Sequence, residues 1–118
     1  HKPEDEESKR LTFAQAATGA SGIETLLSLS LELYHNGSLK LETIIKALTS
    51  SPAKILKIDK GNLSTGNDAD LCIVDIYKPW IVKKDKLVSK SKNTSIEDKK
   101  LQGKVTNTFV KGKELFKL

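Results

Sequence analysis

Few side chains in this sequence carry groups that could do chemistry, and they lie far apart. His1 and His35 are the only histidines, and Cys72 is the only cysteine. Imidazole and thiolate groups act as zinc ligands or nucleophiles when several of them stand at short, defined spacings. No such spacing occurs here, and no glycine-rich phosphate-binding loop is present. The residues themselves therefore predict no self-sufficient active site.

The surroundings of these residues predict structural roles. Cys72 lies in the apolar run 71–74, where a cysteine behaves as a small core residue. His35 directly precedes an Asn-Gly pair, a left-handed stop for a helix, and is expected at the surface. Gly19 and Gly22 could let the backbone approach a ligand closely, although a turn that enters a helix explains them nearly as well.

Helices are predicted in the first half of the chain. Leu26, Leu29 and Leu33 recur at the helical period and predict a helix that ends at the Asn-Gly pair. It is expected to start at Ile23, which places Glu24 in the first turn, where a carboxylate favours the helix dipole. Further helices are predicted over residues 41–49 and from the Ser-Pro pair at 51–52, with Ser as the N-cap.

The second half is predicted to be β structure. Glycines at 61 and 66 flank a turn-rich stretch, after which a short apolar run indicates a buried strand. A Lys-Gly pair near the end is typical of a hairpin turn. Strands are predicted over 71–74, from Trp80, and as a hairpin over 103–116; loops are predicted over 1–12 and over 83–100, the latter with one ordered turn.

Composition limits the function classes. The 118 residues are 37% hydrophobic and 30% charged, which suits one modest domain. No apolar run is long enough to span a membrane, and the start is too highly charged for a signal peptide. Residues 83–118 hold eleven lysines and four acidic residues, but arginine and stacking aromatics are scarce, which argues against nucleic acid. The single cysteine favours the cytosol.

Four segments together resemble one family, the dihydroorotases, which are metal-dependent amidohydrolases. HKPE followed by EESKRLTFAQAATGASGIETLL is similar to the stretch after the family's last barrel strand. LTSSPAKILKI resembles a family helix, and GNLSTGNDADLCIVDI matches a signature shared widely among amidohydrolases. KSKNTSIEDKKLQGKVTNTFVKGKELF resembles the family's closing stretch. The first and fourth segments point to dihydroorotase more than to hydantoinase or allantoinase.

The resemblance implies an α/β fold, namely the C-terminal end of a (β/α)8 TIM barrel plus the C-terminal strands of a small β-sandwich unit. Residues 1–58 would form the last loop and helices of the barrel, and residues 59–118 the β unit. His1 would directly follow the aspartate that the family uses as general base. Because the sequence contains no methionine, we expect that it is not a complete translation product. The resemblance implies that it is a C-terminal piece, which we expect to be inactive alone. No catalytic residue and no zinc ligand is expected within it, since all of these would lie upstream.

The resemblance also implies a reaction and a binding site. Dihydroorotases interconvert dihydroorotate and N-carbamoylaspartate in cytoplasmic pyrimidine biosynthesis, using zinc. Thr18 and Gly19 match a Phe-Gly pair whose backbone contacts the pyrimidine ring. Glu4 stands where the family has a histidine that binds the substrate carboxylate.

Glu4 leaves alternatives open, because two carboxylates in a pocket of low dielectric constant repel each other. The first is an active dihydroorotase in which Lys2 takes over carboxylate binding. The second is a non-catalytic dihydroorotase-like protein that serves as a structural partner, for example of aspartate transcarbamoylase. The third is another cyclic amidohydrolase. The expected ligand is a small molecule, with neither nucleic acid nor a membrane as a partner.

Overall fold

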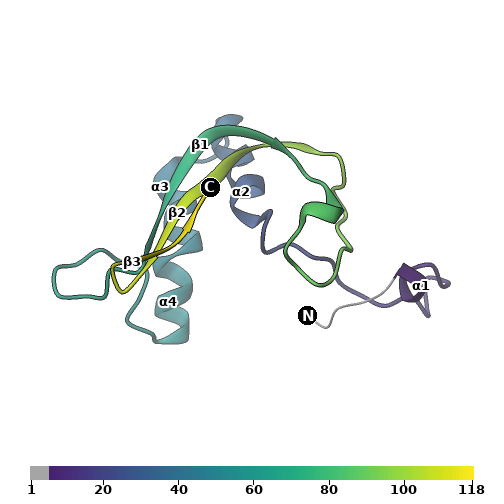
Figure 1. Cartoon of the computed structure of the whole chain (residues 1–118), viewed down its shortest axis with the longest axis horizontal. Coiled ribbons are helices and arrows are strands. Elements are labelled where there is room, and N and C mark those ends of the chain that lie inside the picture. The colour runs from purple at the N-terminus through teal and green to yellow at the C-terminus, as the bar shows by residue number, and fades with distance from the viewer. Residues whose placement is uncertain (1–5) are drawn as a thin grey trace.

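The computed structural model describes residues 6–118, in which helices come first and strands follow (Figure 1). The predicted order of elements is confirmed. One helical turn interrupts the stretch 1–12, which was predicted to be loop throughout. The elements are α1 (Glu6–Lys9), α2 (Leu26–His35), α3 (Leu41–Leu48), α4 (Ser50–Leu56), β1 (Leu71–Ile81), the 3-10 helix η1 (Lys84–Lys86), β2 (Lys100–Val110) and β3 (Lys113–Lys117).

Helix α2 follows the leucine period, but it begins later than predicted. A turn occupies the preceding residues, because the N–H groups of Thr25 and Leu26 both bond to the carbonyl of Gly22, at 3.2 and 2.9 Å. The helix ends where predicted, with Gly37 in the left-handed region at φ 77°. Leu31 is fully buried on its inner face.

Helices α3 and α4 follow one another with Thr49 between them. Pro52 is the third residue of α4 rather than its first, so the predicted helix start was two residues late. The proline is tolerated there because the first N–H groups of a helix have no partner within it. Ile44 and Ala53 are buried, one from each helix.

Strands β1, β2 and β3 form an antiparallel sheet in that order. The predicted hairpin is confirmed, and its turn residues Lys111 and Gly112 both have positive φ, at 50° and 77°. The separate strand predicted from Trp80 is wrong, because β1 runs on without a break. A register shift between Asp75 and Pro79 accommodates the proline, which lacks an N–H, on a strand at the sheet edge.

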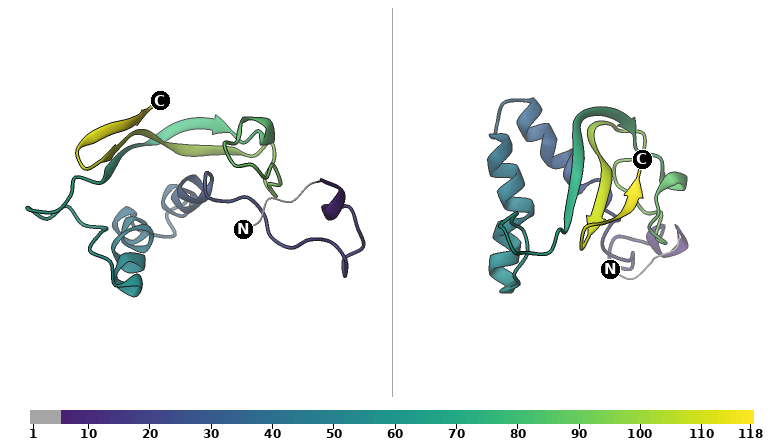
Figure 2. Two further views of the ribbon diagram at one scale, coloured as in Figure 1. Left: turned by 60° about the horizontal axis from the view of Figure 1, so that its bottom comes forward. Right: turned by 60° about the vertical axis from the view of Figure 1, so that its left-hand side comes forward.

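The sheet lies across one side of the helices, with α2 against β2 (Figure 2). Gly103 on β2 makes this close approach possible. A Cβ atom there would stand 2.3 Å from Cδ1 of Leu31, and φ at this glycine is +98°. Ser28 on α2 ties the layers together, since its hydroxyl donates to the Gly103 carbonyl at 2.6 Å and accepts from the Trp80 indole at 3.1 Å.

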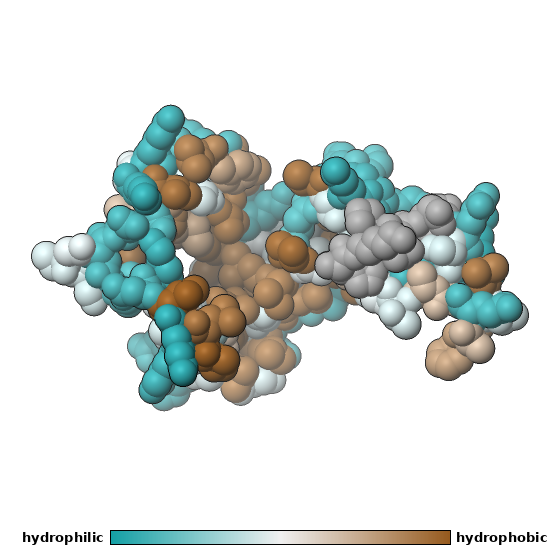
Figure 3. Space-filling view, turned by 90° about the horizontal axis from the view of Figure 1, so that it is seen from below, coloured by the Kyte–Doolittle hydropathy of each residue, from teal (hydrophilic) through white to brown (hydrophobic). Residues whose placement is uncertain are grey.

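Much apolar surface is uncovered in residues 6–118. The radius of gyration is 16.5 Å, against the roughly 13–14 Å typical of a compact domain of this length. Phe13, Ile23 and Val88 are 103%, 93% and 89% exposed. Apolar side chains fill the middle of the face seen in Figure 3. None of the helices described is long and apolar enough to cross a bilayer.

Candidate functional site

Two of the three predicted binding residues, Thr18 and Gly19, lie in a loop between α1 and α2, here called the 17–25 loop. Lys9, the last residue of α1, holds its first part. The Lys9 ammonium donates to three successive carbonyl oxygens, those of Ala17, Thr18 and Gly19, at 2.7, 3.1 and 2.8 Å. Gly19 has φ 89°, which a glycine adopts without strain. The loop is therefore curled around one cation.

A second segment, residues 87–93, holds the same loop from the other side. The side-chain amide of Asn93 donates to the Gly19 carbonyl at 2.8 Å. The Ser21 N–H donates to the Asn93 carbonyl at 2.7 Å, and the Ser21 hydroxyl donates to the Ser91 carbonyl at 2.8 Å. The structure thus brings together the first and fourth segments of the family resemblance.

Glu24 also joins the 17–25 loop to segment 87–93, and these contacts together are here called the junction. Its carboxylate oxygens accept the N–H groups of Val88 and Ser89 at 3.0 and 2.9 Å. Glu24 was expected in the first turn of α2, but it lies in the turn before that helix, and the N–H groups it binds belong to a distant loop. Lys92 in turn donates to the Leu87 carbonyl, which closes segment 87–93 on itself.

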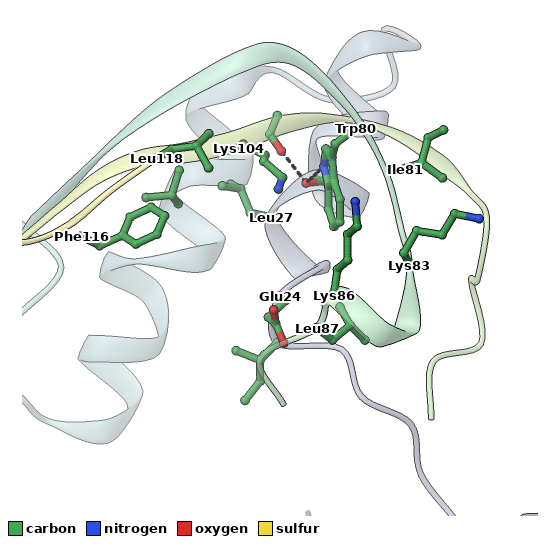
Figure 4. Close-up of a pocket in the computed structure, with 14 residues that line it drawn as sticks. Glu24, Leu27, Trp80, Ile81, Lys83, Lys86, Leu87, Lys104, Phe116 and Leu118 are labelled. Atoms are coloured by element: carbon green, nitrogen blue, oxygen red, sulfur yellow. Dashed lines mark hydrogen bonds between the residues drawn. The ribbon is translucent and has the colours of Figure 1, made fainter. Parts of the chain in front are cut away.

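Two hollows border the junction. A pocket of about 370 Å³ lies between the 17–25 loop and segment 87–93. Beside it lies a larger pocket of about 660 Å³. Leu27, Trp80 and Phe116 contribute apolar walls to this pocket (Figure 4). The Lys104 ammonium stands 4.6 Å from the centre of the Trp80 ring, a cation–π arrangement.

The structure places two of the three predicted binding residues. Thr18 and Gly19 are exposed in the 17–25 loop, whereas Glu4 lies outside the described residues.

Of two other predictions, that for Cys72 is wrong and that for His35 is confirmed in its place but not in full exposure. His35 is the last residue of α2 and is half-buried, and its Nε2 donates to the Ile76 carbonyl at 3.0 Å. This carbonyl lies in the irregular stretch of β1 around Pro79, where the register with β2 shifts. Cys72 is exposed and carries a free thiol, because the outer side of β1 at this position is uncovered in the described residues.

Residues 6–118 do not fit a zinc ion. Within this range no three His, Cys, Asp or Glu side chains are grouped closely enough to hold a metal. The described residues can contact and enclose a ligand, and side chains that could hold a metal would have to come from outside them.

The amidohydrolase signature of the third segment has a structural role. Asp70 accepts the Lys111 N–H at 2.7 Å and the Lys60 ammonium at 2.6 Å, and the Gly112 N–H bonds to the Ala69 carbonyl at 3.1 Å. The Lys60 ammonium, and then the Lys111 N–H, hold the pKa of the Asp70 carboxyl below its usual value. The residues of this signature therefore hold the turn of the β2–β3 hairpin through hydrogen bonds.

Sequence reasoning did not find Lys9, Glu24 or Asn93 as site residues. All three stand within the motifs quoted for the resemblance, in EESK, GIET and SKN, which is the signal that could have singled them out. Their roles depend on contacts between distant segments, which the sequence motifs do not reveal.

A model of the amidohydrolase family matches residues 9–115 of the chain. The chain belongs to the amidohydrolase family. Among curated members, it is 43% identical to the dihydroorotase of Ehrlichia chaffeensis over 117 residues, 99% of this chain and 26% of the relative. It is 40% identical to the dihydroorotase of Geobacter metallireducens, covering 99% of this chain and 28% of the relative. The chain spans about a quarter of the length of these amidohydrolases.

Solved amidohydrolases share the fold. The L-hydantoinase (dihydropyrimidinase) from Arthrobacter aurescens superposes with a TM-score of 0.82 at 31% identity, over 88% of this chain and 24% of that one. The D-hydantoinase (dihydropyrimidinase) from a Thermus species gives 0.82 at 25% identity, over 98% and 26%. The predicted fold class, part of an α/β barrel amidohydrolase, is confirmed.

Proposed function

We propose that this chain is part of a dihydroorotase, which opens the cyclic amide of dihydroorotate to N-carbamoylaspartate and catalyses the reverse reaction. The observation that carries the proposal is the junction between the 17–25 loop and segment 87–93, fixed by Asn93 and Glu24. The 17–25 loop lies in the first segment of the resemblance, and residues 90–93 begin the fourth, which are the two segments that point to dihydroorotase more than to related enzymes. Identity of 40–43% to curated dihydroorotases along almost the whole chain supports it.

The part that this chain plays is binding and orientation of the substrate. Thr18 and Gly19 are exposed and belong to a loop tied down on two sides. A cyclic amide presents N–H and C=O groups in one plane, and backbone N–H groups can donate to its carbonyl oxygen. Backbone contacts also tolerate threonine where the family has phenylalanine. We therefore assign the ring contacts to the backbone at positions 18 and 19.

The proposal extends to the complete polypeptide. Zinc would be held by side chains outside residues 6–118, since those residues offer no ligand cluster. Residues 1–58 would belong with the barrel and residues 59–118 with the small β unit. The reaction would serve pyrimidine biosynthesis in the cytoplasm.

Two alternatives have their own supporting observations. Glu4, in place of a carboxylate-binding histidine, favours a non-catalytic partner of aspartate transcarbamoylase. The superposition on hydantoinases favours a cyclic amidohydrolase with another substrate.

The test is turnover by the complete polypeptide, with dihydroorotate, hydantoin and dihydrouracil offered separately. We expect kcat/KM for dihydroorotate to exceed that for hydantoin by about 100-fold or more, as for sites that pair with a substrate's polar groups. A preference for hydantoin or dihydrouracil would support the third alternative and overturn the proposal. Absence of all turnover, with co-purification of aspartate transcarbamoylase, would support the second.

A further inference from the structure

We propose that Lys9 is a positioning residue that sets which side of the 17–25 loop faces the substrate. This inference rests on the proposed function, because it takes that loop as the substrate-binding segment. The observation behind it is that one ammonium binds the carbonyl oxygens of three consecutive residues, Ala17, Thr18 and Gly19.

Three successive carbonyls do not converge on one point by themselves. Their dipoles present negative ends to one another, and a positive charge at the centre makes the arrangement favourable. An ammonium carries three N–H donors on one atom, and here the three bonds are 2.7, 3.1 and 2.8 Å long. The curl of the loop therefore depends on the Lys9 charge and not only on its packing.

Asn93 adds a second hydrogen bond to the last of the three carbonyls, that of Gly19. The Gly19 carbonyl receives Lys9 and the Asn93 amide, each at 2.8 Å, and a carbonyl oxygen has two lone pairs. Both lone pairs of this oxygen are therefore used, and it is not an acceptor for a ligand.

The orientation of the N–H groups follows from the peptide plane. The described chain contains no cis peptide, and in a trans peptide the N–H points opposite to the C=O of the same plane. Because the carbonyls of Thr18 and Gly19 point to Lys9, the N–H groups of Gly19 and Ala20 point away from it. The loop thus presents donors outward, which suit an acceptor oxygen of the substrate, a ring carbonyl or a carboxylate.

The experiment compares Lys9→Met, which keeps the stem and removes the charge, with Lys9→Arg, which keeps the charge. Lys46→Met, at an exposed lysine on α3, is the matched control. Two quantities are measured in the complete polypeptide: amide hydrogen exchange of residues 17–22 and of α2, and the steady-state constants for dihydroorotate.

We expect Lys9→Met to speed exchange in residues 17–22 by about tenfold or more without changing α2, because only the local opening energy falls. KM should rise by about tenfold with a smaller change in kcat, the pattern of lost substrate binding. Lys9→Arg should recover part of both effects, and Lys46→Met should show neither.

Unchanged exchange in Lys9→Met, or an equal increase in α2, would overturn the inference. Faster exchange with an unchanged KM would also overturn it, because the loop would then not orient the substrate. If the wild-type protein fails to hydrolyse dihydroorotate, the proposed function falls. The exchange comparison still decides whether Lys9 holds the loop. If Lys9→Met does not fold, Lys9→Gln supplies the comparison, because it removes the charge and keeps a polar head on an unbranched stem. Exchange in Lys9→Gln equal to wild type would then overturn the inference.

Discussion

The side-chain amide of Asn93 donates a 2.8 Å hydrogen bond to the carbonyl oxygen of Gly19, across 74 positions of sequence. This bond joins the loop before α2 to the segment before β2, and Ser21 strengthens the link with two further bonds. The proposed binding loop is therefore shaped by the last third of the chain as well as by the residues next to it.

Asn93→Asp is expected to loosen the loop. The substitution replaces an N–H donor with a carboxylate oxygen that faces the Gly19 carbonyl, so attraction becomes repulsion. We expect the free energy of unfolding to fall by about 1–3 kcal/mol and KM to rise. Asn36→Asp is the matched control, because Asn36 uses its side-chain oxygen to accept the Ser38 N–H at 3.0 Å and an aspartate keeps that acceptor. Urea unfolding of the complete polypeptide measures the difference; equal losses for both variants would contradict this account.

Gly103→Ala should be among the most damaging small substitutions. The new Cβ would stand 2.3 Å from Leu31 Cδ1, and the backbone would hold alanine at φ +98°. Overpacking and backbone strain together are expected to cost about 2–4 kcal/mol. Gly22→Ala provides the comparison, since a Cβ at Gly22 meets nothing within 4 Å. Thermal unfolding should show a much lower midpoint for Gly103→Ala; a shift no larger than that of the control would contradict the clash.

Stability is expected to respond to acid through Asp70. Lys60 and the Lys111 N–H lower the pKa of the Asp70 carboxyl below 3.8 in the folded protein, so the folded state favours the charged form. The resulting stabilisation is present above pH 3.8 and is lost as the pH falls through the lowered folded pKa. Asp70→Asn should therefore be less stable than wild type at pH 7, and the gap should narrow below about pH 4.

The control for this pH effect is Asp59→Asn, an exposed position in the preceding loop. Unfolding midpoints measured from pH 7 to pH 3 give the comparison. A constant difference in unfolding midpoint between wild type and Asp70→Asn across this range would show that the stabilisation does not depend on the carboxylate charge.

Glu4→His should improve binding of dihydroorotate by the complete polypeptide. The prediction comes from the sequence, because Glu4 lies outside the described residues. Replacing a carboxylate by an imidazole removes repulsion of the substrate carboxylate, and KM is expected to fall by about tenfold or more. Glu7→His, three positions along the same acidic run, is the control. An unchanged KM would show that position 4 is not at the carboxylate site.

The 118-residue chain alone is expected to be inactive and prone to aggregate. Side chains such as Phe13, Ile23 and Val88 are almost fully exposed, and exposed apolar patches of this kind drive association. Calorimetry and size-exclusion chromatography measure the outcome. A sharp, cooperative unfolding transition of a monomer would contradict the expectation.

Local patterns in the sequence predicted the elements well. The leucine period predicted α2, and the Lys-Gly pair predicted the hairpin, since both signals depend on residues close together in the chain. Pro79 misled the strand prediction because a proline is compatible with a continuous edge strand when the register shifts beside it. Position in the sheet, not local sequence, decides that question.

The site was less predictable, because its contacts join distant segments. Gly19 was chosen from a motif, but nothing local to it indicates that Lys9 and Asn93 share its carbonyl. Cys72 was expected in the core because its neighbours are apolar, yet burial depends on what covers the strand. His35 was expected at the surface, and it is half-buried because it donates a hydrogen bond to a carbonyl in an irregular stretch of β1.

The two bonds from Glu24 to the backbone of Val88 and Ser89 also fix an order of events during synthesis. The carboxylate leaves the ribosome 64 and 65 residues before the groups that it binds. At a synthesis rate of about 5–20 residues per second, several seconds pass before Glu24 can form these two hydrogen bonds. The proposed binding surface therefore cannot be completed until residues 87–93 have been made.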